Sequence, residues 1–255
     1  MTSRGVRTFC FVNNRVGWQI VKWLKGRGTD IVGLAIHPKH RLLYGDETLE
    51  AAALDPRAVF DGSLLQTESV RDAILALRPD VGVSVYFGYV IKPDLFERFP
   101  LGCVNLHAAA LPFNRGMHPN VWSIVDRTPA GVTLHYIDRE IDRGDIIAQQ
   151  MVPVEPHDTG ETLYRKLEAA AVDLFQTTWP QVEGGTAPRI CQPEGGSYHR
   201  RTDVDLIDHI DLDRTYTARA LIDIIRARTF PPHRGAYFST GGRKVYLRLQ
   251  LTPEE

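Results

Sequence analysis

The feature that most constrains how this chain folds is an alternation between short apolar runs and stretches with helical spacing. Residues 8–12 (TFCFV) and 31–36 (IVGLAI) are continuous apolar runs, as expected of strands that are buried on both faces. Between these runs, apolar side chains recur every three or four residues across 16–24, which predicts a helix that stops at Gly26. Strands that alternate with helices at this spacing predict right-handed β-α-β units in a mostly parallel, doubly wound α/β sheet.

The alternation continues as far as residue 107 and then changes character. The next expected elements are helices at 70–77 and 95–99 and strands at 81–86 and 103–107. From residue 131 onward, two strands follow one another with no helix between them, at 131–137 and 146–152. We expect this pair to run antiparallel at the edge of the sheet, joined by a turn at 138–145.

A longer helix and a small C-terminal piece are expected in the rest of the chain. Asp158 and Glu161 have the spacing of a capping pair, and Gly184-Gly185 closes the helix that they open. The buried face of this helix is expected to carry Leu163, Leu167, Ala170 and Leu174. A linker rich in proline and glycine then predicts a boundary near residue 195, between a main domain (1–195) and a C-terminal region (196–255).

The C-terminal region is expected to hold a helix at about 218–227 and a hairpin at 235–247. A segment of this size makes a poor independent core. We therefore expect it to dock on the main domain or on a second subunit.

Composition excludes several functional classes. The chain has 255 residues with 30 Lys and Arg against 31 Asp and Glu, and such a balance disfavours a dedicated nucleic-acid binder. The three cysteines, Cys10, Cys103 and Cys191, form no CxxC pair, which argues against a disulfide framework and a structural zinc site. No run approaches the roughly 18 apolar residues that span a bilayer. We expect a soluble cytoplasmic protein without a membrane or nucleic-acid partner.

Familiar α/β-enzyme motifs are missing. The first β-α turn, Val12-Asn-Asn-Arg-Val-Gly17, has a single glycine and no GxGxxG, so the usual binding of NAD is not expected. The sequence has neither a GxxxxGK[ST] phosphate loop nor a GxSxG nucleophile elbow. His37 and His40 are closely spaced, but their proline-broken turn favours a solvated loop over a metal site. We therefore expect no metal.

The most informative polar residues end the strand at 103–107. Asn105 and His107 are two residues apart, so their side chains leave the same face of the strand. Ligands of open α/β sheets bind beyond the carboxyl ends of the strands. An amide donor beside an imidazole suits the stabilisation of an oxyanion with transfer of a proton. Position alone leaves a structural alternative open, in which Asn105 caps a turn and His107 is a satisfied polar residue.

Four short motifs follow one another in a distinctive order. They are Asn-x-His at 105–107, Leu-Pro-x-x-Arg-Gly at 111–116, Gly-Val-Thr-x-His at 131–135 and Ile-Asp-x-Gly-x-Ile-Ile at 141–147. Together they resemble the 10-formyltetrahydrofolate-dependent formyltransferases, which include glycinamide ribonucleotide, methionyl-tRNA and nucleotide-sugar formyltransferases. The resemblance covers roughly residues 8 to 180, and each motif is weak by itself.

The resemblance implies roles for individual residues. Asn105, His107 and Asp142 match the family's catalytic set: the first two stabilise an oxyanion and move the amine proton, and Asp142 orients the imidazole. The implied formyl donor is N10-formyltetrahydrofolate, and the residues matched to its binding site are Tyr89, Val90, Ile91, Ile137, Arg139 and Ile141. The chain departs from the family at Ala109, where members often carry a serine.

Within this family, the motifs are most similar to those of sugar N-formyltransferases, which act on dTDP- or GDP-linked amino-dideoxy sugars. Residues 196–255 carry 10 Lys and Arg and 8 Asp and Glu, a surplus of two that is small for gripping RNA. The preferred substrate is dTDP-4-amino-4,6-dideoxyglucose, and the candidate substrate-binding residues are Asn14, Arg15, Arg115, Phe230 and Tyr237. The resemblance also implies a homodimer formed through the C-terminal region. The alternatives are a methionyl-tRNA or glycinamide ribonucleotide formyltransferase and a non-catalytic folate- or nucleotide-sugar-binding module.

Overall fold

The computed structural model describes residues 5–254, which form two compact units. The first unit contains the chain up to His107, together with Thr133–Gln149 and Ala171–Gln192. The second contains Ala108–Val132, Gln150–Ala170 and the chain from Pro193 onward. Each unit is therefore built from three separate segments of sequence, and a linear division at residue 195 stays a prediction.

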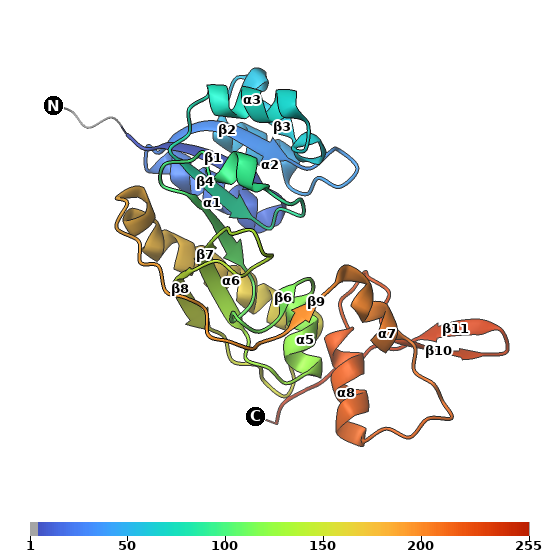
Figure 1. Ribbon diagram of the computed structural model, residues 1–255. Helices are drawn as coiled ribbons and strands as arrows, with labels where there is room; N and C mark the ends of the chain where they lie inside the picture. Colours follow the sequence, from blue (N-terminus) through green and yellow to red (C-terminus); the bar gives the residue numbers. More distant parts are fainter. Residues whose placement is uncertain (1–4, 255) are drawn as a thin grey trace. The chain divides into compact units, whose positions relative to one another are not determined.

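A seven-stranded, mostly parallel sheet organises the first unit (Figure 1). Across the sheet the strands are β3 (Val59–Asp61), β2 (Asp30–Ile36), β1 (Arg7–Val12), β4 (Val81–Val85), β5 (Cys103–His107), β7 (Gly131–Tyr136) and β8 (Ile146–Met151). The first five strands pair in parallel, and β7 runs antiparallel to β5. The predicted α/β class is confirmed, as is the placement of the last two strands at one edge.

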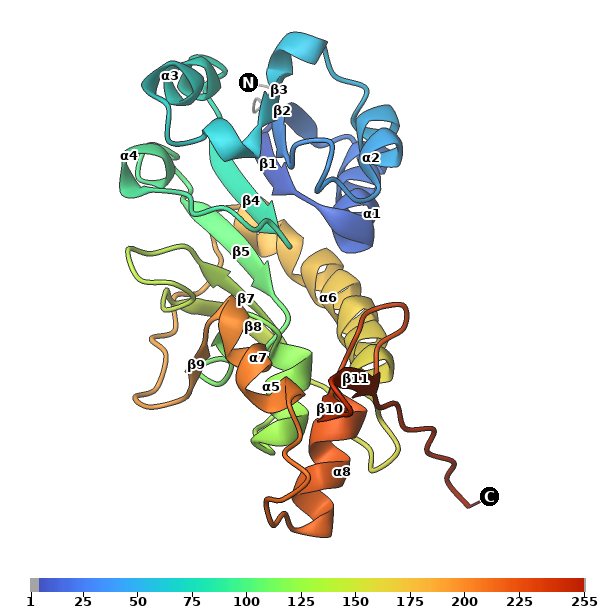
Figure 2. The ribbon, with the colours of Figure 1, turned by 90° about the vertical axis from the view of Figure 1, so that its right-hand side faces the viewer.

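The strand order requires helices on both faces of the sheet. From β1 the chain steps outward to β2 and β3, returns beside β1 as β4, and then continues to β5. Right-handed crossovers that proceed in opposite directions place their helices on opposite faces. Figure 2 shows α1 (Asn14–Gly26) and α2 (Gly45–Ala52) on one side of these strands, and α3 (Glu68–Ala76) and α4 (Pro93–Phe96) on the other.

Apolar side chains fill both sides of the sheet. On the side of α3 and α4, the buried core consists of Phe9, Phe11, Ala35, Leu65, Ile74, Ile91, Leu95, Phe96, Phe99 and Cys103. On the other side, Trp23 of α1 packs edge-on against Phe175 of α6 (Gly160–Glu183), with ring centroids 6.1 Å apart. Each large side chain buried in this way contributes about 1.5–3 kcal/mol to stability.

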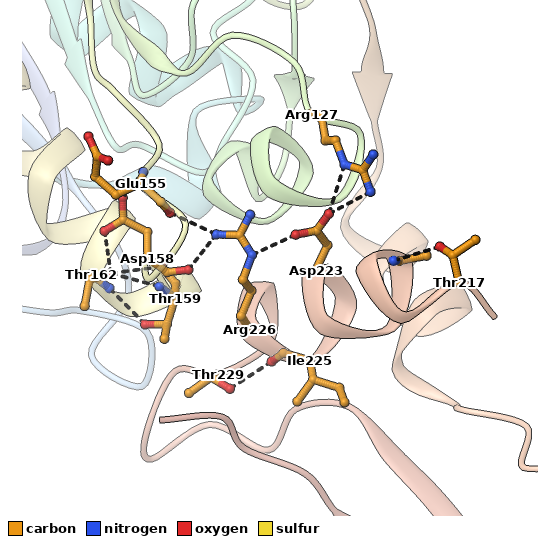
Figure 3. Close-up of polar contacts among 11 residues, drawn as sticks. Arg127, Glu155, Asp158, Thr159, Thr162, Thr217, Asp223, Ile225, Arg226 and Thr229 are labelled. Carbon is orange, nitrogen blue, oxygen red and sulfur yellow. Dashed lines mark hydrogen bonds and ion pairs between the residues drawn. The ribbon is translucent and has the colours of Figure 1, made fainter. Parts of the chain in front are cut away.

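Two helix starts differ from the sequence prediction. The helix predicted at 95–99 is α4, which begins earlier because Pro93 presets the backbone angle of its first turn. The predicted capping pair at α6, Asp158 with Glu161, does not form. Instead Thr159 and Thr162 exchange backbone-to-hydroxyl hydrogen bonds of 2.9 and 3.3 Å, while the Asp158 carboxylate receives the Thr162 hydroxyl at 2.9 Å (Figure 3).

The second unit contains the remaining helices and two small sheets. Helix α5 (Pro119–Val125) lies beside α8 (Ala218–Ala227) in both views (Figures 1 and 2). The short strands β6 (Arg115–Gly116) and β9 (Tyr198–His199) pair in parallel. The predicted hairpin is confirmed as β10 (Tyr237–Thr240) and β11 (Arg243–Tyr246), preceded along the chain by the one-turn helix α7 (Asp205–Asp208). Within residues 5–254, no helix combines the length and apolar character needed to cross a membrane.

Candidate functional site

Two of the predicted catalytic side chains extend from the end of β5. Asn105 and His107 are both half-buried and lie on the same face of this strand. The antiparallel partner strand β7 places His135 directly opposite Asn105. The amide nitrogen of Asn105 lies 3.1 Å from Nε2 of His135, so a third polar side chain joins the predicted pair.

The third predicted catalytic residue, Asp142, lies in the turn between β7 and β8. Its backbone has φ +54°, a left-handed conformation that costs a non-glycine residue about 1–2 kcal/mol. Its Oδ2 lies 3.6 Å from Nε2 of His107, and its Oδ1 lies 3.5 Å from the Asn105 amide nitrogen and 3.7 Å from Nε2 of His135. The carboxylate therefore contacts all three side chains of the paired strands.

Gly144 allows this turn to close. A Cβ atom at this position would overlap the carbonyl oxygen of Tyr136, so any other residue would displace the turn that carries Asp142. The Tyr136 amide also donates to the Asp145 carbonyl at 2.9 Å. The Asp-x-Gly spacing of the sequence motif thus has a steric reason in the packing of the turn.

Burial keeps His135 neutral. Removal from water lowers the pKa of His135 to about 4, and the nearby His107 adds to this effect, while Asp142 and the carbonyl of Tyr136 oppose it. Nδ1 of His135 lies 2.8 Å from the Tyr136 carbonyl oxygen, which can only accept, so Nδ1 carries the proton. Nε2 is then an acceptor, and it fixes which end of the Asn105 amide faces it.

The cluster combines the groups needed for acyl-type transfer to an amine. It has an amide donor, an imidazole that can take up a proton and a carboxylate that can stabilise the resulting imidazolium. His107 and Asp142 are each about 12% exposed in their side chains, so both are largely shielded from water and still reachable by a ligand. Within the described residues, no cluster of histidine, cysteine and carboxylate side chains has the arrangement of a metal site.

The segment predicted to contact folate follows β4 and is held by several polar contacts. Tyr89 is half-buried, its hydroxyl accepts a hydrogen bond from Arg41 at 3.3 Å, and its ring packs against His37 with centroids 4.9 Å apart. His37 is buried and accepts a hydrogen bond from the Gly88 amide at 3.0 Å. The prediction of a solvated loop is therefore wrong for His37, whose ring packs against the chain after β4. It holds for His40, which is exposed.

The other predicted folate residues differ in exposure. Val90 is 59% exposed and Ile141 is 51% exposed. Ile91 is buried in the hydrophobic core and Ile137 packs against that core, so these two can offer a ligand little beyond their backbone. Arg139 pairs with Glu97 at 2.9 Å on the surface. Ile91 belongs to the core cluster and Phe87 and Ile137 pack against it, so the two segments predicted to bind folate share this core.

The predicted substrate residues fall into both units. In the first unit, Asn14 begins α1, where its side chain accepts a hydrogen bond from the Val16 amide at 2.9 Å, and Arg15 is exposed in the next position. In the second unit, Arg115 is only 7% exposed and donates to the Gly195 carbonyl at 3.1 Å, so this contact organises the chain around β6. The burial of Arg115 differs from the accessible arginine that the sequence suggested.

The two aromatic candidates of the C-terminal region have different surroundings. Phe230 packs against Tyr164 and His233, with ring centroids 5.4 and 5.3 Å away. Tyr237 lines a cavity of about 280 Å³ that it shares with Tyr246, Lys244 and Arg234. Both rings are half-buried, and of the two only Tyr237 lines this cavity.

His135 ends the Gly-Val-Thr-x-His motif, but the sequence alone predicted no role for it in the site. Its signal was the alternation of Thr133 and His135, which places both on one face of a strand. Only the register of β7 against β5 reveals that this face is the one that carries Asn105 and His107.

Comparisons with known proteins agree on one family. A family model described as formyl transferase matches residues 21–178, and one described as N-formyltransferase dimerization C-terminal domain matches residues 203–253. A dTDP-4-amino-4,6-dideoxyglucose formyltransferase from Mycobacterium bovis is 32% identical over 166 residues, which cover 62% of this chain and 71% of the relative.

Solved structures show the same relationship. A 4-N formyltransferase from Francisella tularensis superposes with a TM-score of 0.84 and 28% identity, over 98% of this chain and 99% of that chain. The formyltransferase PseJ from Anoxybacillus kamchatkensis was solved with UDP-4,6-dideoxy-4-formamido-L-AltNAc and tetrahydrofolate. It superposes with a TM-score of 0.57 and 31% identity, over 78% of this chain and 88% of that chain.

Proposed function

Because the chain belongs to the formyl transferase family, we propose that it transfers a formyl group from N10-formyltetrahydrofolate to the amino group of a nucleotide-linked amino-dideoxy sugar. The first candidate substrate is dTDP-4-amino-4,6-dideoxyglucose, the substrate in the name of the relative from Mycobacterium bovis. The 4-N formyltransferase and PseJ, at 28% and 31% identity, also support an amino sugar as the acceptor.

The observation that carries this proposal is the contact of Asp142 with Asn105 and His107 at 3.5 and 3.6 Å. The donor supplies an electrophilic formyl carbon. The net exchange forms a bond between this carbon and the amine nitrogen, breaks its bond to N10, and moves one proton from the amine to N10. His107 takes up the amine proton, and Asp142 orients and stabilises the imidazolium that results. The Asn105 amide donates to the oxygen that becomes negative as the amine adds.

The residues around this cluster fit a folate donor. Val90 and Ile141 expose apolar surface on the two segments that pack against the core cluster, which suits a flat heterocycle. We assign the donor to Tyr89, Val90, Ile91, Ile137, Arg139 and Ile141, with Ile91 and Ile137 contributing their backbone. Asn14, Arg15, Arg115, Phe230 and Tyr237 are proposed for the nucleotide sugar.

We also propose a homodimer that forms through residues 203–253, as the description of the matching family model suggests. This region exposes Leu206, Leu212 and Val245, the kind of surface that a partner covers. Sedimentation of the wild-type protein should give a dimer, and the double variant Leu206→Glu, Val245→Glu should give a monomer. Met151→Glu is the control, because Met151 is also an exposed apolar residue (56%) but lies outside the matched region.

The free cysteines fit a reducing compartment, so we place the enzyme in the cytoplasm. We also propose that the transfer reaction uses no bound metal.

The test of the substrate is a folate-coupled assay of the purified protein. The panel contains dTDP-, GDP- and UDP-linked 4-amino and 3-amino dideoxy sugars, with glycinamide ribonucleotide and initiator methionyl-tRNA as competing acceptors. We expect turnover of at least one amino sugar and none of the competing acceptors. Turnover of glycinamide ribonucleotide or methionyl-tRNA alone would contradict the sugar assignment, and binding without turnover of any acceptor would indicate a non-catalytic module.

A further inference from the structure

Residues 189–192, here called the strap, run along the turn that carries Asp142. The strap lies between the two regions matched by family models, which end at residue 178 and begin at residue 203. Ile190 and Ile146 exchange two backbone hydrogen bonds of 2.8 and 3.0 Å, which anchors the strap to the start of β8. The Arg189 guanidinium lies 3.6 Å from the centroid of the Tyr136 ring, at the end of β7. The strap therefore contacts both strands that flank the turn.

Gln192 is the residue of the strap that touches the turn itself. Its side-chain amide nitrogen donates to the carbonyl oxygen of Asp142 at 2.8 Å and to that of Gly144 at 2.9 Å. The two carbonyls belong to the peptide groups Asp142–Arg143 and Gly144–Asp145. One side-chain amide thus fixes the first and the third peptide planes after the catalytic carboxylate.

The orientation of this amide is determined by the two carbonyls. If the amide were reversed, its oxygen would face two other oxygens. The Gln192 Oε1 atom is itself buried and has no hydrogen-bond partner among the described residues. Burying an unsatisfied amide oxygen costs free energy, so the position of Gln192 depends on its two donor bonds.

The turn needs such support because Asp142 adopts a left-handed backbone conformation, which costs a non-glycine residue free energy. Asp142 has φ +54°, and residues in this region persist only when surrounding contacts hold them. The side-chain distances from Asp142 to His107 and Asn105, 3.6 and 3.5 Å, leave little tolerance before the contacts are lost. A shift of about 1 Å in a catalytic group lowers turnover by about 100-fold.

We propose that Gln192 is a positioning residue for the transfer reaction, acting on Asp142 through the backbone of the turn. This inference rests on the proposed function, since it assumes that Asp142 serves the transfer of a formyl group. Gln192 has no contact with the reacting atoms, and its effect reaches them only through Asp142.

The test compares Gln192→Glu, Gln192→Ala and the control Cys191→Ser in the full-length protein. Glutamate has the same shape but places oxygens against both carbonyls, whereas Cys191 is exposed and adjacent in the strap. We expect kcat to fall by about 10–100-fold in both Gln192 variants, with KM for donor and acceptor changed by less than about 3-fold. Cys191→Ser should match the wild type.

A double-mutant cycle separates positioning from general damage. In an Asp142→Asn background, Gln192→Ala should lower kcat by less than about 3-fold, because the group that it positions is already lost. Full additivity of the two losses, or a rise in KM with kcat unchanged, would overturn the inference.

Backbone hydrogen exchange of residues 138–145 provides a readout that needs no substrate. We expect faster exchange in both Gln192 variants than in Cys191→Ser. If exchange rises but the wild type turns over no acceptor, the proposed function fails and the support of the turn stands. If the wild type is active and the Gln192 variants match it, the inference fails and the proposed function stands.

Discussion

The Asn105–His107–Asp142 site and the C-terminal region at 203–253 use side chains in opposite ways. In the site, His135 is 1% exposed and contacts Asn105, and the Asp142 carboxylate lies within 4 Å of Asn105, His107 and His135. In the C-terminal region, Leu206 is 81% exposed and Leu212 is 62% exposed. The interactions of such a polar cluster depend on exact distances and angles. The free energy that an exposed apolar surface contributes depends instead on the area that a partner covers. Substitutions in the two regions should therefore differ in size and in kind.

The largest effect is expected from His107→Asn. This substitution removes the group that takes up the amine proton, and we expect kcat to fall by about 10²–10⁴-fold. The measurement is the folate-coupled assay with the best amino sugar of the panel.

The control for His107 is His40→Asn, because His40 is an exposed histidine outside the proposed catalytic, donor and substrate sites. It should leave the fold intact, as checked by circular dichroism and thermal unfolding of both variants. If His107→Asn kept wild-type turnover, the proposed mechanism would be wrong, and the contrast between the two regions would lose its chemical basis.

The next effect concerns the stability of the second unit. Besides its exposed apolar side chains, this unit contains a buried charged network around Arg226. Arg226 is buried and donates to Asp223 at 2.8 Å and to the backbone carbonyls of Glu155 and Asp158 at 3.1 and 2.9 Å (Figure 3). Arg226→Ala removes a donor from the buried Asp223 and from the carbonyls of Glu155 and Asp158, and it should lower the free energy of unfolding by about 3 kcal/mol. Urea denaturation measures this loss.

Arg127 is the matched control for Arg226, because both arginines bind the same carboxylate. Arg127 reaches Asp223 at 2.9 Å but has 52% of its side chain exposed. We expect Arg127→Ala to cost no more than about 1 kcal/mol. Equal losses for the two variants would show that burial does not determine the strength of this network.

The third prediction concerns pH and His135. Its pKa in the folded chain is about 4, below the usual value of 6.5, so the unfolded chain binds the proton first as the pH falls. The stabilisation is fully present above pH 6.5 and is lost as the pH falls toward 4. Between pH 7 and pH 5 the wild type should lose about 2 kcal/mol more than His135→Phe, which has no titratable group there. Urea midpoints at the two pH values measure the difference, and identical losses would contradict the assignment of a neutral, buried His135.

Much of the fold could be predicted because the apolar pattern within one segment is enough to identify it as a strand or a helix. The runs at 8–12 and 103–107 are strands because continuous apolar residues require burial on both faces. The helix at 218–227 has its predicted bounds, since Thr217 supplies a cap and apolar residues recur along one face. The cap of α6 was predicted one residue too early, because Asp158-x-x-Glu161 and Thr159-x-x-Thr162 offer the same spacing and the sequence does not rank them.

The site could be predicted only in part, because the sequence does not reveal the register in which its strands pair. Asn105 and His107 share a face within one strand, which sequence spacing gives directly. His135 joins them because β7 pairs with β5 in one particular register, and a shift of one residue would turn its side chain to the other face. The contacts of Gln192 with the turn span 48 and 50 residues of sequence, and no local pattern encodes them.

The smallest effect is expected at the start of α8, where a substitution would remove a single exposed hydrogen bond of the C-terminal region. The Thr217 hydroxyl accepts from the Ala220 amide at 3.1 Å and so satisfies one of the free donors in the first turn of the helix. Thr217→Ala should lower the free energy of unfolding by about 1 kcal/mol, and Thr217→Ser should restore most of it. The same helix carries Arg226. If the Thr217 cap stabilises only the first turn, the losses in the free energy of unfolding from Thr217→Ala and Arg226→Ala should add when the two substitutions are combined. A combined loss well below the sum would mean that Thr217 and Arg226 stabilise one shared cooperative element, because each single substitution would already have weakened it.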